Sequence, residues 1–448
     1  MAEEQALEEA EERSSSIASN RKQSPANATN DKKPVNLAER RWRSQLLTVG
    51  KKGMVKRLFA NILIALRHAP VWEGMFRYNA FSHTIEIQKA LPWQKSDLEF
   101  EKRQWSDHDD LMLTEWMHRE SIDVTTKQCS DAVYTVAKEN EFHPVREYLE
   151  GLKWDGEDRL TEWLSVYLNA PNTDYEKMIG PRIWISLVSR VMDPGCKADC
   201  MPIYIGDQGQ RKSTALRVMA GDAWFTDQIG GVGGGKDTSI AMSGKWLVEF
   251  SDLDGFHGKN ADELKAFVSR QSDRYRAMFG RYAADYPRQV CFAGTTNQRT
   301  PLRDFTGNRR YWPIHTGNAE VEKLEADRDQ LWAEALARYR KGDPWWLDTP
   351  EARALAAEVA EESREVDVLE EEIEMYLRRL QEKETTIARV IETVMEIEIA
   401  EASRADQMRV AACLQALKWE RVHKRVTDSL GTRRSWVYRP SHTAGTKR

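Results

Sequence analysis

A strand over residues 203–205, a glycine loop and a helix over residues 215–219 follow one another in this chain, and they constrain its fold more than any other segment. Loops of this build hold phosphate groups on backbone N–H groups and on the helix N-terminus. Lys212 would reach the β- and γ-phosphates, and Ser213 would bind Mg²⁺. The segment therefore predicts a nucleotide triphosphate site. Its nucleotide-binding residues are predicted to be Gly206, Gly209, Gln210, Arg211, Lys212, Ser213 and Thr214.

Arg211 stands where the phosphate-loop pattern G-x-x-x-x-G-K-[ST] has its second glycine. A side chain there crowds the loop or changes its dihedral angles, because glycine has conformational freedom that other residues lack. This departure bears on turnover rate more than on nucleotide binding. The alternative interpretation is a solvated strand-to-helix turn that carries Lys-Ser by chance.

Residues 245–252 read as a buried strand that ends in carboxylates, the usual neighbour of a phosphate loop in a parallel sheet. Acids at such a strand end hold Mg²⁺ and polarise water. Glu249 is the better metal-side residue, with Ser213, and either Glu249 or Asp252 could orient the attacking water. The alternative is a charged strand terminus without a catalytic role.

Residues 289–294 read as a third strand, and Asn297 follows it closely enough to bond the γ-phosphate or the water beside it. The turn over residues 307–313 carries two arginines, whose guanidinium groups suit a finger offered to a neighbouring subunit's nucleotide. The predicted catalytic residues are Lys212, Glu249, Asp252, Asn297, Arg309 and Arg310.

In this order the motifs resemble the virulence-associated protein E family of phage, prophage and pathogenicity-island proteins, which is similar to superfamily 3 helicases within the AAA+ class. The resemblance covers approximately residues 41–350 and also rests on residues 143–149, 152–160, 193–197, 264–267 and 273–276. It implies that Lys212 and Ser213 bind ATP and Mg²⁺, that Glu249 and Asp252 form the acidic motif, that Asn297 is the sensor and that Arg309 or Arg310 is the finger.

Basic and aromatic residues alternate between Lys265 and Arg288. Guanidinium groups follow phosphates and rings stack on bases, so this stretch suits a single strand of DNA. In superfamily 3 helicases the corresponding stretch lines the central pore, and the resemblance implies the same use here. The alternative is an amphipathic helix and a hairpin with solvated arginines. The DNA-binding residues predicted here are Lys265, Arg274, Arg276 and Arg281.

Composition excludes a membrane protein, because 31% of the 448 residues are charged and no apolar run approaches the roughly 18 residues that a membrane helix needs. The start of the chain lacks a signal sequence, so we expect the protein in the cytoplasm of a bacterial host cell. Residues 107–110 and the pair Cys196 and Cys200 suggest metal sites, but a helix N-terminus and free thiols are the favoured interpretations.

The C-terminal segment is basic, although the net charge of the chain is −5. Helical patterns from residue 373 precede alternating segments over 421–426 and 435–438, which together look like a winged helix. Its third helix could enter a major groove, with the wing on phosphate. The predicted DNA contacts are Arg421, Lys424, Arg425, Arg433 and Arg434.

The predicted fold class is α/β, with an AAA+-like P-loop core of superfamily 3 helicase type, a helical or mixed N-terminal domain and a C-terminal winged-helix-like module. The predicted divisions are a disordered tail over 1–38, the mixed domain over 39–150, the ATPase core with a helical lead-in over 151–318, a charged helical connector over 319–372 and the basic module over 373–448. In the connector region, Trp332, Trp345 and Trp346 are expected near its contacts with the core.

We interpret the chain as an ATP-dependent, helicase-like DNA replication protein of a phage or other mobile element. It would hydrolyse ATP with Mg²⁺ at the interfaces of a homo-hexameric ring and engage single-stranded DNA in the pore and duplex through the C-terminal module. The alternative is a DNA-binding regulator or interference protein that uses ATP as a slow assembly switch. A primase-helicase has less support, since residues 40–150 show no catalytic primase acid pattern.

Overall fold

The computed structural model describes residues 41–50, 53–94, 100–229, 235–251, 259–277, 280, 282–298, 310–363, 367–380, 383–428 and 431–441, without the side chains of 236, 259–262, 425–428 and 431–435. Its contacts divide the chain into two compact units. The first comprises Met1–Phe76, Gln88–Glu101 and Ser106–Val136, and the second comprises Arg77–Ile87, Lys102–Trp105 and Ala137–Arg448.

The first unit is mostly helical. Its elements are β1 (Thr48–Val49), β2 (Met54–Val55), α3 (Phe59–His68), α4 (Asp107–Arg119) and most of α5 (Thr126–Glu139). The acids of residues 107–110 lie in the first turn of α4, where Asp109 accepts hydrogen bonds from the backbone and hydroxyl of Ser106. Asp109 therefore forms a capping box with the N-cap residue Ser106.

A small four-stranded sheet has the order β5-β4-β3-β6. Its strands are β3 (Phe76–Asn79), β4 (Thr84–Ile87), β5 (Arg103–Gln104) and β6 (Glu141–Phe142). The tip of the hairpin formed by β3 and β4 belongs to the second unit. Ser243 Oγ donates to Ser82 O at 2.9 Å, and Gly244 N donates to Phe81 O at 3.2 Å. The ring of His83 lies 4.5 Å from that of Tyr286.

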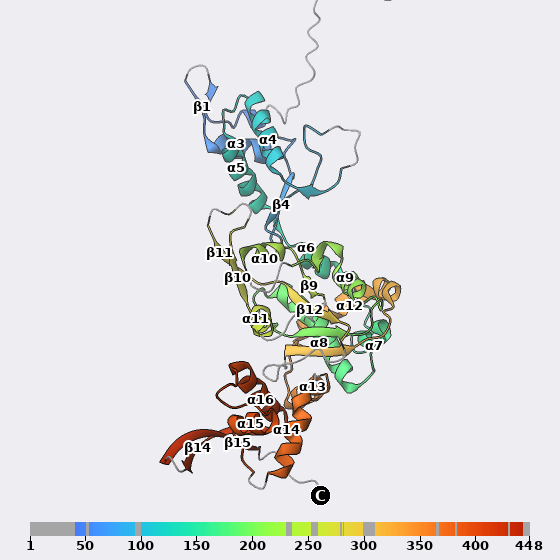
Figure 1. Cartoon of the computed structure of the whole chain (residues 1–448). Helices are drawn as coiled ribbons and strands as arrows, with labels where there is room; N and C mark the ends of the chain where they lie inside the picture. The colour runs from blue at the N-terminus through green and yellow to red at the C-terminus, as the bar shows by residue number, and fades with distance from the viewer. Residues whose placement is uncertain are drawn as a thin grey trace, which may run out of the picture. The chain divides into compact units, whose positions relative to one another are not determined.

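The core of the second unit is a five-stranded parallel sheet with the order β13-β7-β12-β9-β8. Figure 1 labels two of its strands, β9 and β12. The strands are β7 (Met201–Ile205), β8 (Phe225–Thr226), β9 (Leu247–Phe250), β12 (Cys291–Thr296) and β13 (Tyr311–His315). Because Thr296 pairs with Ile205 and Gly294 with Phe250, the carboxyl ends of the three central strands meet at one edge.

Helices cover both faces of this sheet, since successive side chains of a strand point to opposite faces. Tyr204 packs in a cluster with Trp184, Leu216 and Trp332, whereas Ile203 packs with Phe267 on the other face. The helices and turns of this region are α6 (Pro144–Gly151), α7 (Trp163–Leu168), α8 (Asp174–Met192), α9 (Lys212–Ala220), the 3₁₀ turn η1 (Asp222–Trp224), α10 (Lys236–Ala241), α11 (Lys259–Val268), α12 (Val321–Lys341) and α13 (Pro350–Glu362). A separate antiparallel hairpin joins β10 (Ser272–Tyr275) to β11 (Ala284–Pro287).

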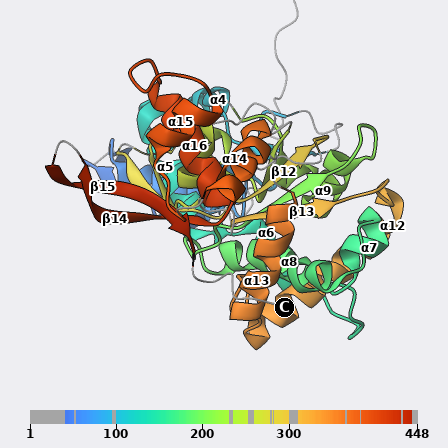
Figure 2. The same cartoon turned by 60° about the horizontal axis from the view of Figure 1, so that its bottom comes forward.

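The chain then forms three helices and a long antiparallel hairpin, labelled in Figure 2. They are α14 (Val368–Arg379), α15 (Ile387–Val394), α16 (Arg404–Ala416), β14 (Trp419–Asp428) and β15 (Gly431–Pro440). Ile373, Ile391, Leu414 and Tyr438 meet in one apolar cluster. Helices followed by a hairpin are the arrangement that the sequence predicted here.

Two helices are preceded by segments of other structure. Val55 lies in β2, and Leu58 is the N-cap residue of α3. Before α7, the backbone N–H groups of Arg159 and Leu160 donate to the Glu334 carboxylate at 2.8 and 3.0 Å, which fixes this segment to α12.

Candidate nucleotide and DNA sites

The loop between β7 and α9 requires glycine at its first position. A Cβ at Gly206 would lie 2.8 Å from Thr316 O, so only glycine fits there. Gly209 has φ of +87° and Arg211 has φ of +59°, both in the left-handed region. Arg211 therefore adopts the backbone conformation that glycine favours, at the cost of local strain.

Lys212, the first residue of α9, folds back over the loop. Its ammonium Nζ donates to Gly206 O at 2.6 Å, to Asp207 O at 2.9 Å and to Asn297 Oδ1 at 3.2 Å. Asn297 follows β12, so the predicted lysine and the predicted sensor side chain meet at the carboxyl edge of the sheet. A phosphate bound on the loop would lie beside both.

Glu249 lies on β9 and is fully buried. Its Oε1 accepts hydrogen bonds from Ser213 Oγ and from Thr295 Oγ1, each at 2.6 Å. Its Oε2 is buried and has no hydrogen-bond partner among the described residues. A buried carboxylate oxygen without a donor is costly, and a cation would satisfy it. Hydroxyl and carboxylate oxygens are ligands that Mg²⁺ prefers, so Ser213 and Glu249 fit the ion.

The loop is braced from the segment after β13 and from α12. Ala319 N donates to Gln210 O at 3.0 Å, and the Gln210 Oε1 is buried without a partner among the described residues. The Arg211 guanidinium binds both carboxylate oxygens of Glu322 at 2.9 and 2.7 Å. This bond lowers the pKa of Glu322 to about 2. Sequence reasoning missed Glu322, which lies in no motif. It placed Thr295 in the polar strand end before Asn297 without giving it a role.

Arg310 immediately precedes β13, whereas the phosphate loop follows the end of β7. Met201 pairs with Tyr311 and Ile205 with His315. Arg310 therefore lies near the amino ends of these strands, and the phosphate loop lies at the carboxyl end of β7. Its Nε lies 3.4 Å from Asp199 Oδ2. Arg309 and Asp252 lie outside the described residues.

The β10–β11 hairpin carries two of the predicted single-strand contacts. Arg274 forms an exposed ion pair with Asp285 at 3.0 Å, and Arg276 Nε donates to Gly280 O at 2.7 Å. Lys265 on α11 is only 7% exposed, so in this conformation it presents little surface to a strand. Arg281 lies outside the described residues.

Arg288 belongs to the protein interior rather than to a DNA-facing surface. It binds both Asp273 oxygens at 2.6 and 2.8 Å, and its guanidinium lies 4.7 Å from the Phe267 ring centre. This corrects the interpretation of the whole basic and aromatic stretch as one exposed surface.

On the C-terminal hairpin, the Arg421 guanidinium lies 4.2 Å from the ring centre of Trp436, which is 49% exposed. Lys424 pairs with Glu384 at 2.9 Å. The side chains of Arg425, Arg433 and Arg434 lie outside the described ones. An arginine stacked on an exposed indole is a surface suited to nucleic acid.

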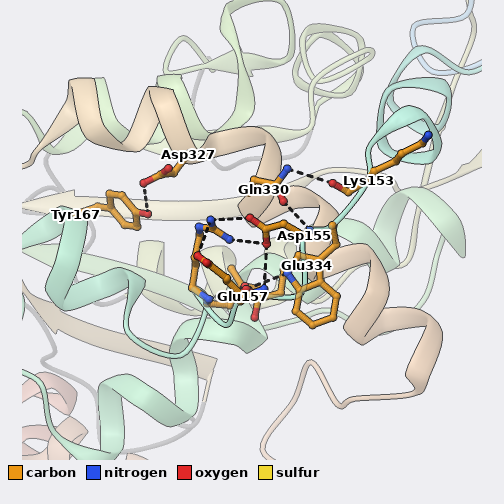
Figure 3. Close-up of polar contacts among 10 residues, drawn as sticks. Lys153, Asp155, Glu157, Tyr167, Asp327, Gln330 and Glu334 are labelled. Atoms are coloured by element: carbon orange, nitrogen blue, oxygen red, sulfur yellow. Dashed lines mark hydrogen bonds and ion pairs between the residues drawn. The ribbon is translucent and has the colours of Figure 1, made fainter.

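Figure 3 shows how the segment before α7 is fixed to α12. Gln330 accepts from Asp155 N at 3.0 Å and donates to Lys153 O at 3.1 Å. Fully buried Glu334 accepts the two backbone N–H groups named above and binds Arg338 at 2.6 Å. The sequence showed this segment only as a family motif, and its role here is to anchor the lead-in to the core.

Within the part of the chain that the structure describes, no group of three or more His, Cys, Asp or Glu side chains is arranged to hold a metal ion. No helix in the described ranges is long and apolar enough to cross a membrane.

Comparison with known proteins identifies the central region. Residues 149–365 match the Virulence-associated protein E-like domain. This part of the chain is a virulence-associated protein E-like domain. It contains the phosphate loop, Glu249 and Asn297, and its parallel sheet is consistent with a P-loop core. A P-loop domain of this family implies nucleotide binding and ATPase activity.

Solved structures similar to the chain include the apo structure of the NrS-1 C terminal region (305-718), at 10% identity and a TM-score of 0.45, covering 82% of this chain and 95% of that one. Two A-form apo structures of the NrS-1 C terminal region have TM-scores of 0.43 at 10% identity, each covering 82% of this chain and 96% of that one. No curated protein sequence matches the chain.

Proposed function

We propose that the protein is an ATP-dependent DNA motor of superfamily 3 type within the AAA+ class, acting as a helicase-like replication protein of a phage or other mobile element. The observation that carries the proposal is the meeting of Lys212, Asn297 and Glu249 at the carboxyl edge of one parallel sheet. In open sheets this edge is where nucleotides bind.

In this proposal each side chain has a distinct role. Lys212 neutralises the β- and γ-phosphates, and Asn297 orients the γ-phosphate or the attacking water. Ser213 and Glu249 hold Mg²⁺, which supplies charge stabilisation for phosphoryl transfer. The hydrogen bond from Thr295 fixes Glu249 in place. Asp252 is a further candidate for orienting water.

The position of Arg310 supports an assembly of several subunits. The five residues of β13 rise about 16 Å at roughly 3.3 Å each, which separates Arg310 from its own phosphate loop. An arginine finger at this place would serve the nucleotide of a neighbouring subunit. A closed ring, proposed to be a hexamer, gives every subunit such a neighbour.

DNA binding is proposed at two places. Arg274 and Arg276 on the β10–β11 hairpin would contact a single strand in the ring's pore. Arg421 and Trp436 belong to the hairpin proposed as the wing of a winged helix, which would contact duplex.

Steady-state ATP hydrolysis with and without single-stranded DNA tests the proposal. We expect hydrolysis that DNA stimulates, and Lys212→Ala should abolish it because the loop then lacks its cation. Lys341→Ala removes the same charge from the exposed end of α12 and should leave the rate unchanged. DNA-independent, slow hydrolysis would favour the alternative of an ATP-switched DNA-binding regulator, a role that strain at Arg211 would suit.

A further inference from the structure

A cavity of about 460 Å³ opens near the amino ends of β7 and β13, whereas the phosphate loop lies at the carboxyl end of β7. It is lined by the segment before β7, the residue before β13, the turn that leads into α13 and the first turns of α13 itself. The residues that line it are Lys197, Asp199, Cys200, Arg310, Trp345, Trp346, Leu347 and Arg353. Its volume falls within the range of about 300–1,000 Å³ that is typical of small-ligand sites.

The charges of this cavity favour an anion. Its lining holds three cations, Lys197, Arg310 and Arg353, against one acid, Asp199. Asp199 contacts Arg310 through a single guanidinium nitrogen at 3.4 Å, and Lys197 lies 3.9 Å from it. Burial raises the pKa of the Cys200 thiol to about 12, so this side chain adds no negative charge at neutral pH.

The aromatic side of the cavity is held in place before any ligand arrives. Trp345 Nε1 donates to Lys197 O at 2.9 Å, and Arg182 Nε donates to the backbone oxygen of Trp346 at 3.0 Å. The two indole rings meet edge to face with centres 4.9 Å apart. Trp346 is nevertheless 48% exposed. A fixed, exposed indole beside cations is a platform for a base that carries a phosphate.

We propose that this cavity binds a nucleotide unit, with the base stacked on Trp346 and the phosphate between Lys197 and Arg353. The unit is either a free nucleoside monophosphate or one residue of a single DNA strand, since both present a base and a phosphate. The site is distinct from the phosphate loop, because it lies near the amino ends of β7 and β13.

Binding is measured by anisotropy with a labelled oligothymidylate and by equilibrium dialysis with thymidine monophosphate. The full chain carries Lys212→Ala throughout, which removes the phosphate loop's lysine from both measurements. Trp346→Ala removes the ring on which the base would stack, and Arg353→Gln removes a cation that would bind the phosphate. Trp154→Ala is the matched control for an exposed indole, and Arg378→Gln for an exposed arginine. An abasic strand of equal length tests whether the base is needed.

We expect Trp346→Ala to weaken the oligothymidylate by about five- to a hundredfold, the effect of losing one stacked base. Arg353→Gln should weaken it in the same direction, Trp346→Phe should retain most of the affinity, and both controls should bind like the parent. If thymidine monophosphate binding weakens in parallel, the site takes free nucleotide. If only the strand binds, the site belongs to a DNA path.

Equal affinity of the parent, Trp346→Ala and Arg353→Gln for both ligands would overturn the proposal. So would an abasic strand that binds as tightly as oligothymidylate and loses as much on Trp346→Ala. Competition by an acidic peptide as strong as that by thymidine monophosphate would assign the cavity to a protein partner instead. None of these results depends on ATP hydrolysis, so a failure here is separate from a failure of the proposed motor function.

Discussion

Ser213 Oγ donates a hydrogen bond of 2.6 Å to Glu249 Oε1. Ser213 lies on α9, which follows β7, and Glu249 lies on β9, so the bond spans the intervening strand β12. Thr295, on β12 itself, donates to the same oxygen. Three elements of the sheet region therefore fix one carboxylate at the place where the candidate Mg²⁺ site requires it.

Thr295→Val should destabilise the protein by about 1–3 kcal/mol, because a buried carboxylate loses a donor that valine cannot replace. Urea unfolding of the full chain measures the loss. Thr295→Ser keeps the hydroxyl and should recover most of it. Equal stability of the valine and serine variants would mean that the Thr295 hydroxyl does not stabilise the buried acid.

Arg310→Ala should leave ATP affinity nearly intact and lower hydrolysis, since a finger typically changes the rate by about 10³ to 10⁵. Asp199→Asn is the matched control, because it removes the partner of Arg310 and leaves the arginine. Rates of mixed parent and variant subunits locate the effect. Activity that scales simply with the parent fraction would argue against action across an interface.

Arg211→Gly tests whether the unusual loop residue slows turnover. Glycine relieves the left-handed strain at φ of +59° but loses the bond to Glu322. Glu322→Gln weakens that bond while keeping the arginine, so it separates the two effects. We expect the rate of ATP hydrolysis by Arg211→Gly to equal or exceed that of the parent protein. A fall in Arg211→Gly that Glu322→Gln does not share would indicate that Arg211 itself binds phosphate.

Stability should fall as the pH is lowered from about 7 towards 5, because burial lowers the pKa of His83 to about 4, with Lys138 adding to the shift and Glu141 opposing it. Unfolded histidine titrates near 6.5, so over this range the unfolded chain binds a proton that the folded chain does not. Thermal unfolding at several pH values measures the effect. His83→Asn suits the left-handed φ of +58° and should flatten the profile, whereas an unchanged slope would assign it to other groups.

Arg433→Ala combined with Arg434→Ala should weaken DNA binding by the full chain. It should also flatten the salt dependence of the affinity, by about one unit of log-log slope for each phosphate that the variant no longer neutralises. Arg378→Ala with Arg379→Ala removes the same charge from α14 and is the control. If both pairs weaken binding equally, the wing has no special role and binding depends on overall charge.

Much of the nucleotide site could be predicted because its residues follow from local patterns. The strand, loop and helix around Lys212 are contiguous, and the apolar run ending near Glu249 identifies β9 without tertiary information. Asn297 follows from the same logic one strand later. The mixed α/β class and the basic hairpin were predictable for the same reason.

The remaining features depend on contacts between distant segments. Arg211 and Glu322 meet because of the direction in which α12 leaves the sheet, and no sequence spacing encodes that direction. In the sequence Arg288 resembles a surface arginine, but in the structure it is enclosed by Asp273 and Phe267. Trp346 is the reverse case: the sequence places this aromatic residue near the core contacts, and in the structure about half of it is exposed.

The helix α12 contacts two different segments of the chain at two points along its length. Its first turn holds Glu322, which binds Arg211 in the phosphate loop, and further along it Glu334 binds the segment that leads into α7. Twelve residues of helix separate these points, a rise of about 18 Å. A rigid helix of this length would carry a shift of Glu322 at the phosphate loop to the segment over residues 155–160. Occupancy of the nucleotide site would then act as a mechanical signal at that distance.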